Sequence, residues 1–203
     1  MVLMATTAGR LWSATNQFWN RKAPSDWSDL EIKELITESP WAKAVHINPR
    51  RGVPGAAPAP DPAAQARSLE GRGGGAPSPM VDIDPNAGGA GVVYTVRWES
   101  AAPVVDALKT PFPADFANHY VIGMVDFSQR DAVATLLVKG KEPVQAGATH
   151  TTRTGVALFG FSKELLAIEP QDKEVQFSVN TSQFSLKIKF ELKEMLYRGK
   201  LAL

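Results

Sequence analysis

Three histidines and a few carboxylates are the side chains of this chain that could bind a metal ion and activate water. His46, His119 and His150 are separated from one another by more than 30 residues. Two histidines three or four residues apart on one helix face are the usual local sign of a zinc site, and the chain has no such pair. A metal-assisted hydrolase would need the fold itself to bring His119 and His150 to a carboxylate such as Asp126. We therefore predict no metal, no cofactor and no catalytic residue, and keep this hydrolase as an alternative.

The motifs of nucleotide-binding proteins and of common hydrolases are absent. Gly73-Gly74-Gly75 is not followed by the Lys-Ser/Thr pair of a phosphate-binding loop. The serine in Gly160-Phe161-Ser162-Lys163 lacks the glycine spacing of a nucleophile elbow. The chain has no cysteine, which excludes disulfides, thiolate metal ligands and a cysteine nucleophile.

One acidic stretch partly resembles a calcium loop. Asp82, Asp84 and Asn86 place oxygen ligands at the first, third and fifth positions. Ala87 and Val93 stand where the turn glycine and the bidentate glutamate belong. Half of the coordination shell is missing, so we expect no calcium site there.

Tryptophan is concentrated near the N-terminus, where it could serve protein contacts. Four of the five tryptophans lie in the first 41 residues. Exposed tryptophans anchor protein interfaces, whereas buried ones contribute to a core. The positions of Trp27 before a helix cap and of Trp41 after a proline favour docking on the chain's own body. The residues expected to carry an interaction are Trp19, Trp27, Trp41, Val45 and Ile47.

A short helix is predicted over residues 29–38. Ser28 and Glu31 form a capping box, in which each side chain bonds to the backbone N–H of the other residue. Pro40 disfavours helical backbone in the residue before it and ends the helix.

An alternating strand follows over residues 42–47, with Lys43 and Val45 on the same face. The helix and strand together, residues 23–47, bury too little surface to fold alone. We therefore expect this segment to dock on another part of the chain or on a neighbouring molecule.

A long disordered insertion is predicted over residues 48–91. It holds eight of the chain's 15 prolines, the glycine run and almost no large apolar residues. Such a composition cannot offset the entropy of ordering by burial. As a flexible coil it would span roughly 35–40 Å, enough to cross a small domain or to reach a neighbour.

The remaining residues, 92–203, predict a β-rich body. A short helix capped by Ser100 is expected to run through Leu108. Residues 131–138 are ambiguous between helix and strand. Strands are expected over residues 92–98, 120–125, 149–153 and 156–161.

The clearest pattern is a long hairpin near the C-terminus. Large apolar residues alternate with polar ones over residues 175–179 and again over 184–192. One face of this hairpin is therefore buried and the other is in solvent. Lys187, Lys189 and Lys193 line the solvent face of its last strand, which we interpret as a sheet edge where lysine discourages aggregation.

Together these patterns predict an α+β, β-rich fold, an antiparallel sheet or sandwich with two or three short helices. The 203 residues suit one domain, and a net charge of +1 gives no field that favours nucleic acid. No apolar run is long enough to span a bilayer. The expected division is a flexible N-terminus, a docking segment, the insertion and the body, over residues 1–22, 23–47, 48–91 and 92–203.

Several stretches resemble a family of small exported bacterial proteins of unknown function. They are Phe18–Lys22, Trp27–Glu31, Ser39–Ala42, Val96–Ala101 and Lys189–Leu201. The resemblance implies a periplasmic or secreted protein and brings no activity and no catalytic residues. Members begin with a complete export signal, whereas here residues 5–9 resemble the end of one. A signal remnant and an ordinary flexible terminus are both open.

These features favour a non-enzymatic exported module that acts by binding or assembly, with a protein partner or self-association expected. If residues 23–47 dock on their own body, the protein is a monomer. If they add their strand to a neighbour's sheet, the insertion links subunits by strand addition. The alternatives are a ligand carrier with a pocket between helices and sheet, and the hydrolase built on His119, His150 and Asp126.

Overall fold

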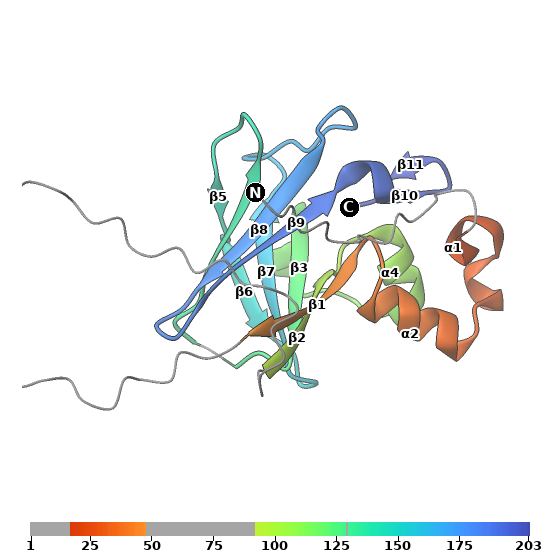
Figure 1. Cartoon of the computed structure of the whole chain (residues 1–203), viewed down its shortest axis with the longest axis horizontal. Helices are drawn as coiled ribbons and strands as arrows, with labels where there is room; N and C mark the ends of the chain where they lie inside the picture. The colour runs from red at the N-terminus through yellow and green to blue at the C-terminus, as the bar shows by residue number, and fades with distance from the viewer. Residues whose placement is uncertain (1–16, 48–91, 129) are drawn as a thin grey trace, which may run out of the picture.

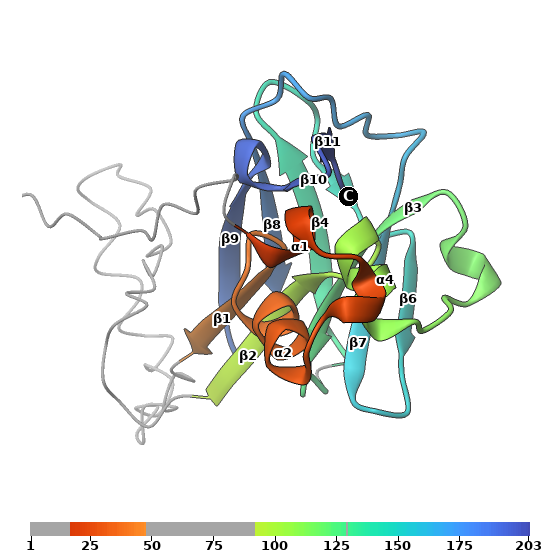
Figure 2. The same cartoon turned by 90° about the vertical axis from the view of Figure 1, so that its right-hand side faces the viewer.

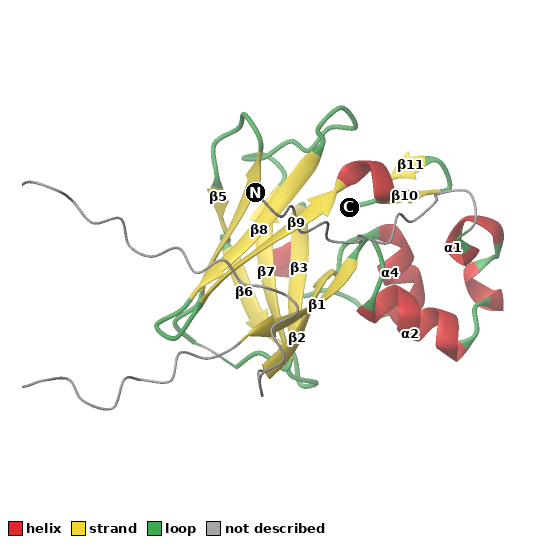
Figure 3. Cartoon of the chain, viewed as in Figure 1, coloured by secondary structure: helices red, strands yellow, loops and turns green. Residues whose placement is uncertain are grey.

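The computed structural model describes residues 17–47, 92–128 and 130–203. In these residues two antiparallel sheets face each other, and the short helices gather at one side (Figures 1 and 3). The first sheet has the strand order β1-β2-β3-β7-β6 and the second the order β5-β4-β8-β9. The predicted β-rich α+β fold is confirmed. The insertion predicted over residues 48–91 lies outside the described residues.

Residues 17–47 contain two α-helices, one 3-10 helix and one strand. They are α1 (Phe18–Arg21), the 3-10 helix η1 (Pro24–Asp26), α2 (Asp29–Thr37) and β1 (Ala42–Ile47). The predicted capping box is present, because Ser28 Oγ accepts from the Glu31 N–H and the Glu31 carboxylate accepts from the Ser28 N–H. Phe18 and Trp19 are buried, so the docking segment begins before the expected boundary at residue 23.

Ser39 turns the chain from α2 into β1. Its hydroxyl donates to the Leu35 carbonyl at 2.7 Å and accepts from the Trp41 N–H at 3.2 Å. These bonds satisfy backbone groups that a buried helix end would otherwise leave without a partner. Pro40 cannot continue the helix, so the Ser-Pro-Trp sequence fixes where β1 begins.

The first sheet starts with a hairpin of β1 and β2 (Val92–Trp98), in which Ile47 stands opposite Val92. Both ends of the segment 48–91 therefore meet at one end of this hairpin. The sheet continues with β3 (His119–Val125), β7 (Val156–Ser162) and β6 (Ala148–Thr151). α2 lies against β1 and β2, and α4 (Ala102–Leu108) packs beside α2 (Figure 2).

The second sheet contains the long C-terminal hairpin. Its strands are β5 (Val144–Gln145), β4 (Val133–Val138), β8 (Glu174–Asn180) and β9 (Ser185–Glu191). The predicted hairpin is β8–β9, and β9 is a sheet edge as predicted. The ambiguous stretch 131–138 forms β4.

The chain crosses between the two sheets just after β5. The Ala146 N–H donates to the Ala134 carbonyl of the second sheet, and the Gly147 N–H donates to the Gly160 carbonyl of the first. The sheets are therefore joined at this corner. At the opposite ends of the two strand orders, β1 and β9 remain as separate edges.

Aromatic rings fill the space between the sheets. Trp98 and Phe190 lie 5.9 Å apart, and Phe161 and Phe177 lie 6.1 Å apart, measured between ring centroids. All four side chains are fully buried. Both pairs meet edge to face, a favourable arrangement for aromatic rings, so apolar contact across the core holds the two sheets together.

Helix α4 begins without the predicted serine cap. Ala101 is the N-cap residue and makes no side-chain hydrogen bond. Ser100 Oγ instead accepts from the Val121 N–H at 3.0 Å, which ties the end of β2 to β3. The predicted Ser100 cap is wrong, because Ser100 precedes the N-cap residue and its hydroxyl bonds to β3 instead.

The C-terminal residues form a small two-stranded hairpin beside α1 (Figure 1). The 3-10 helix η3 (Leu192–Glu194) leads into β10 (Leu196–Tyr197) and β11 (Lys200–Leu201). Arg198 and Gly199 both have positive φ, as a two-residue hairpin turn of the favoured hand requires. A further 3-10 helix, η2 (Ala114–Phe116), precedes β3. No helix in the described parts of the chain is long and apolar enough to cross a membrane.

Candidate interaction site

Five aromatic side chains pack where the N-terminal segment meets the C-terminal hairpin, and we call this cluster the aromatic junction. Its members are Phe18, Trp19, Trp27, Trp41 and Tyr197. The ring centroids lie 4.9 Å apart for Phe18–Trp19, 5.4 Å for Trp19–Trp41, 5.7 Å for Phe18–Trp27 and 6.4 Å for Trp27–Tyr197. Each residue is less than a tenth exposed, so the junction is a closed part of the core.

Hydrogen bonds reinforce this closure. Trp41 Nε1–H donates to the Ala202 carbonyl at 2.8 Å in a buried position. The Tyr197 hydroxyl donates to the carboxylate of Asp106, on α4, at 2.8 Å. Burial, followed by this hydrogen bond, raises the pKa of Tyr197 to about 12, so the hydroxyl keeps its proton at neutral pH. Residues from both ends of the described chain are thus tied together.

A buried ion pair lies beneath α2 on the outer face of β2. Arg97 donates through Nη2 and Nε to Glu99 Oε1 at 2.7 and 3.0 Å, and through Nη1 to the Ile36 carbonyl at 3.3 Å. Gly123 leaves room for the carboxylate, because a Cβ there would stand 2.4 Å from Glu99 Oε1. The pair therefore anchors α2 on the sheet.

The five residues expected to carry an interaction are all buried within the chain. Trp19, Trp27 and Trp41 belong to the aromatic junction, and Val45 and Ile47 join the core from β1. A partner could contact these side chains only if the segment left its own body. Partner contact through them stays a prediction. The backbone of β1 is different, since within the described parts of the chain this strand pairs with β2 on one side and with no strand on the other.

β1 and β9, the end strands of the two sheets, come together at one corner, where Lys43 of β1 reaches Lys189 of β9 (Figures 1 and 2). We call the line along which these two strand edges approach each other the seam. In an antiparallel pair, alternate residues direct their N–H and C=O groups away from the partner strand. Two hydrogen bonds show which residues of β9 bond to β8 and which face away from it. The Thr181 N–H donates to the Phe184 carbonyl and the Leu192 N–H to the Lys173 carbonyl. The residues of β9 whose backbone groups face away from β8 are Ser185, Lys187, Lys189 and Glu191.

The same alternation applies to β1. The Trp98 N–H donates to the Trp41 carbonyl, and the register pairs Lys43 with Val96. Trp41, Lys43, Val45 and Ile47 are therefore the residues whose backbone groups bond to β2. The residues between them, such as Ala44 and His46, direct their backbone groups away from β2. Both sides of the seam therefore carry backbone donors and acceptors that a further strand could bond.

Lys43 bridges the seam. Its ammonium donates to the Lys189 carbonyl at 2.7 Å and lies 5.4 Å from the centre of the Phe190 ring. Burial lowers the pKa of Lys43, and the carboxylates of Glu194 and Glu191 oppose that shift. Burial likewise raises the pKa of Glu194. A charged side chain thus stands where the N–H of another strand would bond to β9.

Sequence reasoning did not identify Lys43 as part of a site. The strand pattern placed it on the same face as Val45, which is the buried face. A lysine on the buried face of an edge strand is one device that prevents strands from pairing edge to edge. That feature is the sequence signal that could have located the seam.

The structure keeps the residues of the alternative metal site apart. His119 is the first residue of β3 and Asp126 follows its last residue, so roughly 23 Å of strand separates them. His150 lies on β6, opposite Leu158 of β7. The hypothesis that these three residues share a metal ion does not fit this structure, because His119 begins β3 and Asp126 follows the far end of the same strand. The described residues contain no group of three or more His, Asp or Glu side chains that could hold a metal.

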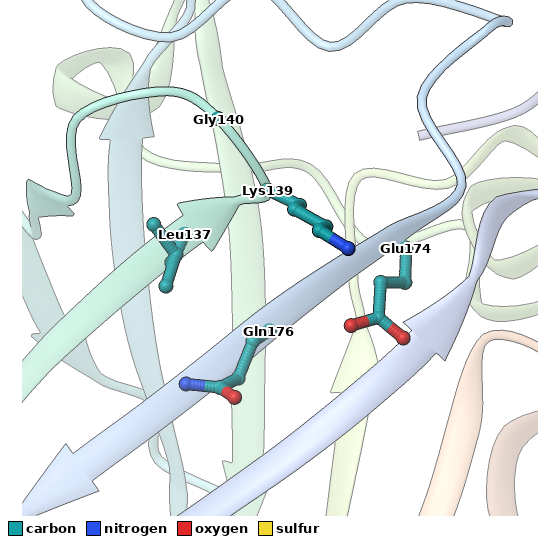
Figure 4. Close-up of a pocket in the computed structure, with 5 residues that line it drawn as sticks. All are labelled: Leu137, Lys139, Gly140, Glu174 and Gln176. Atoms are coloured by element: carbon teal, nitrogen blue, oxygen red, sulfur yellow. The ribbon is translucent and has the colours of Figure 1, made fainter.

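A hollow of about 240 Å³ lies on the outer face of β4 and β8. Its lining residues are Leu137, Lys139, Gly140, Glu174 and Gln176 (Figure 4). Glu174 is already paired with Lys189 at 2.8 Å. Ligand pockets are usually larger than this, so we interpret the hollow as a feature of the exposed sheet surface.

Asp82, Asp84 and Asn86, considered above as a calcium loop, lie outside the described residues. Comparisons with protein-family models, with curated proteins and with solved structures find no match to this chain. The candidate site therefore rests on geometry: the side chains of the docking segment are buried in the core, whereas no strand among the described residues pairs with the outer edges of β1 and β9.

Proposed function

We propose that this protein is a non-enzymatic exported module that acts by binding or assembly and receives its partner as a β-strand added at the seam. The observation that carries the proposal is that two sheet edges, neither paired with a further strand among the described residues, meet where the side chain of Lys43 joins them. Backbone hydrogen bonds give affinity in such strand addition, and the alternate side chains give specificity.

The exported location belongs to the proposal and rests on the resemblance of residues 18–42 and 189–201 to small exported bacterial proteins. Fractionation of the native cells, with an antibody against the folded chain, tests it. Recovery from the periplasm or the medium supports the location. Recovery from the cytoplasm alone contradicts it and leaves the seam unaffected.

Binding at the seam is tested by selecting displayed random peptides against the full chain. Lys189→Pro removes a backbone N–H that faces the seam while leaving the β8–β9 ladder intact, since proline is tolerated on the outer side of an edge strand. Lys189→Ala is the control, because it removes the same side chain and keeps the backbone N–H. We expect peptides that lose binding in Lys189→Pro and keep at least part of it in Lys189→Ala. A selection that yields no peptide sensitive to Lys189→Pro contradicts the proposal.

A second candidate function is self-assembly through exchange of the docking segment. Its supporting observation is that Ile47 stands opposite Val92 although the whole segment 48–91 lies between them. The same β1–β2 contacts can therefore form within one chain or between two copies. A covalent connection makes the pairing of β1 with β2 intramolecular, with an effective concentration of about millimolar, so exchange needs a high local concentration of protein.

Exchange is tested by shortening this connection. Replacement of residues 48–91 by Asn-Gly closes β1 and β2 as a tight hairpin, because Ile47 and Val92 are direct partners. Light scattering then compares the mass of both proteins over a concentration series. Oligomers of the natural chain that disappear in the shortened one support exchange. A monomer in both, or the same oligomer in both, rules exchange out.

A further inference from the structure

Lys43 breaks the side-chain pattern of β1 at the seam. Trp41, Lys43 and Val45 share the face of the chain that is directed into the core, and the two neighbours of Lys43 on this face are buried. An apolar side chain at this position would continue the face and add to the core. A lysine instead brings a charge among apolar groups, which costs free energy unless the charge has partners. What the ammonium binds is therefore the key to its role.

The partners of the Lys43 ammonium lie on β9 and just after it. The ammonium donates to the Lys189 carbonyl at 2.7 Å and lies 5.4 Å from the centre of the Phe190 ring. Burial lowers the pKa of Lys43, but the carboxylates of Glu194 and Glu191 favour its charged form. A hydrogen bond from a charged donor is stronger than one between neutral groups, and the ring adds a cation–π attraction. These contacts hold the side chain across the seam.

The Lys189 carbonyl is an acceptor that an added strand would need. Lys189 stands near the middle of β9, and its backbone groups face the seam. The backbone of a strand paired with β9 would lie about 4.8 Å from that of β9, in the space that the Lys43 side chain crosses from β1. The strand and the side chain cannot occupy this space together. Pairing along the middle of β9 therefore requires the lysine to move out.

We propose that Lys43 controls strand addition at the seam: its side chain blocks the edge of β9, and a partner strand pairs there only after displacing the ammonium from the Lys189 carbonyl. This inference rests on the proposed function of the seam and adds its regulation. A peptide N–H of the partner replaces the ammonium as the donor to this carbonyl. Because breaking the contacts of Lys43 costs free energy, the natural chain binds strands more weakly than an unblocked edge would, and unwanted pairing is opposed.

The test uses the displayed peptides that bind the natural chain and lose binding in Lys189→Pro. Lys43→Met keeps the length of the side chain without its donor, and Lys43→Ala removes the part that crosses the seam. Each variant should bind these peptides roughly tenfold more tightly than the natural chain, since a hydrogen bond from a charged donor no longer has to be broken. Lys33→Met, the same change at an exposed lysine of α2, is the control and should leave the affinity unchanged.

The two substitutions of Lys43 separate release of the edge from a new contact. The side chain introduced by Lys43→Met can itself contact the peptide, whereas Lys43→Ala leaves no side chain that reaches β9. A tighter affinity confined to Lys43→Met therefore overturns the inference. Equal affinities of the natural chain and both variants overturn it as well. Urea titration of each variant checks that the fold is retained.

A measurement on the natural chain needs no substitution at all. The end of the Lys43 side chain lies near the Phe190 ring, so the NMR signals of its methylene groups should be displaced by the ring current. Saturation with a peptide should move these signals to the positions of an exposed lysine such as Lys33. Signals that keep their positions while the peptide is bound would show that Lys43 does not leave the edge, and would overturn the inference.

Failure of this inference is distinguishable from failure of the proposed function. Equal affinities remove the control by Lys43 and leave the seam as a binding edge. If selection against the natural chain yields no peptide, the selection is repeated with Lys43→Ala. Peptides that bind this variant and lose binding in Lys43→Ala/Lys189→Pro support the inference, because the edge then accepts strands only in the absence of the lysine. A second selection without peptides overturns both proposals.

Discussion

The aromatic junction and the seam are built by the same N-terminal segment, yet one is closed and the other is open. At the junction, Trp41 is fully buried and its indole N–H has a carbonyl partner. At the seam, two positions along the chain, Lys43 reaches across to a neighbouring strand with its side chain. The segment is therefore held by its side chains, while part of its backbone hydrogen-bonding capacity remains available.

This difference suggests that the junction contributes to the stability of the fold and the seam to binding. Aromatic rings that bury 150–250 Å² each dominate the energetics of a core, so the junction should determine whether the protein folds. At the seam, charged lysine side chains oppose unwanted strand pairing, as they commonly do on edge strands. The exposed lysines there should contribute little to the stability of the fold. Substitutions at the two places should therefore give effects of very different size.

The largest effect is expected at the junction. Trp41→Ala removes a fully buried ring and its hydrogen bond to Ala202, and should lower the free energy of unfolding by about 3–5 kcal/mol. Trp41→Phe keeps much of the ring and loses the N–H, so its effect should be smaller. Urea titration followed by circular dichroism measures both. A loss below about 1 kcal/mol for Trp41→Ala would show that the segment is not held there.

A smaller loss is expected at the ion pair that anchors α2. Gly123→Ala would place a Cβ 2.4 Å from Glu99 Oε1, so the carboxylate must shift away from Arg97. We expect a loss of about 1–3 kcal/mol, typical of overpacking a core. Gly147→Ala is the matched control, because its Cβ would meet nothing within 4 Å. Equal effects of the two substitutions would refute the close approach of Glu99 to β3.

The start of α2 should contribute a pH-dependent stability. The hydrogen bond from Lys22, followed by that from the Ser28 N–H, lowers the pKa of Glu31 to about 2. Because the pKa is lowered on folding, this contribution is present above pH 4.5 and is lost as the pH falls from 4.5 toward 2. The stability difference between the natural chain and Glu31→Gln should disappear over that range.

Urea titrations at a series of pH values measure this difference. Glu34→Gln, the same change of charge on the same helix, is the control. A difference for Glu31→Gln that stays constant down to pH 2 would show that the capping carboxylate is not stabilised in the folded chain.

Local patterns predicted most of the fold. The capping box of Ser28 and Glu31 located the start of α2, and period-two alternation located β1 and the β8–β9 hairpin. These features depend on neighbours in sequence. Ser100 was misassigned because its partner, the Val121 N–H, lies on another strand, which no local pattern reveals.

The candidate site was harder to predict for the same reason. The tryptophans could be identified as important, but a buried core position and a binding surface give the same sequence signal. The seam depends on which strands are the edges of two sheets, and therefore on the order of all their strands. Lys43 marks the seam only because its ammonium bonds to the carbonyl of Lys189, which lies far along the chain. The alternation within β1 showed only that Lys43 lies on the same face as Val45.

The smallest effect is expected at the seam. Lys187 is exposed, and Lys187→Glu should change the free energy of unfolding by less than about 0.5 kcal/mol, as is usual for a surface substitution. Its effect should instead be on the binding of peptides at the seam, since the alternate side chains of an edge strand give specificity in strand addition. Urea titration and peptide binding, measured on the same variant, separate these two quantities. If Lys187→Glu costs as much stability as Gly123→Ala, the edge of β9 belongs to the folded core, and the contrast between a closed junction and an open seam fails.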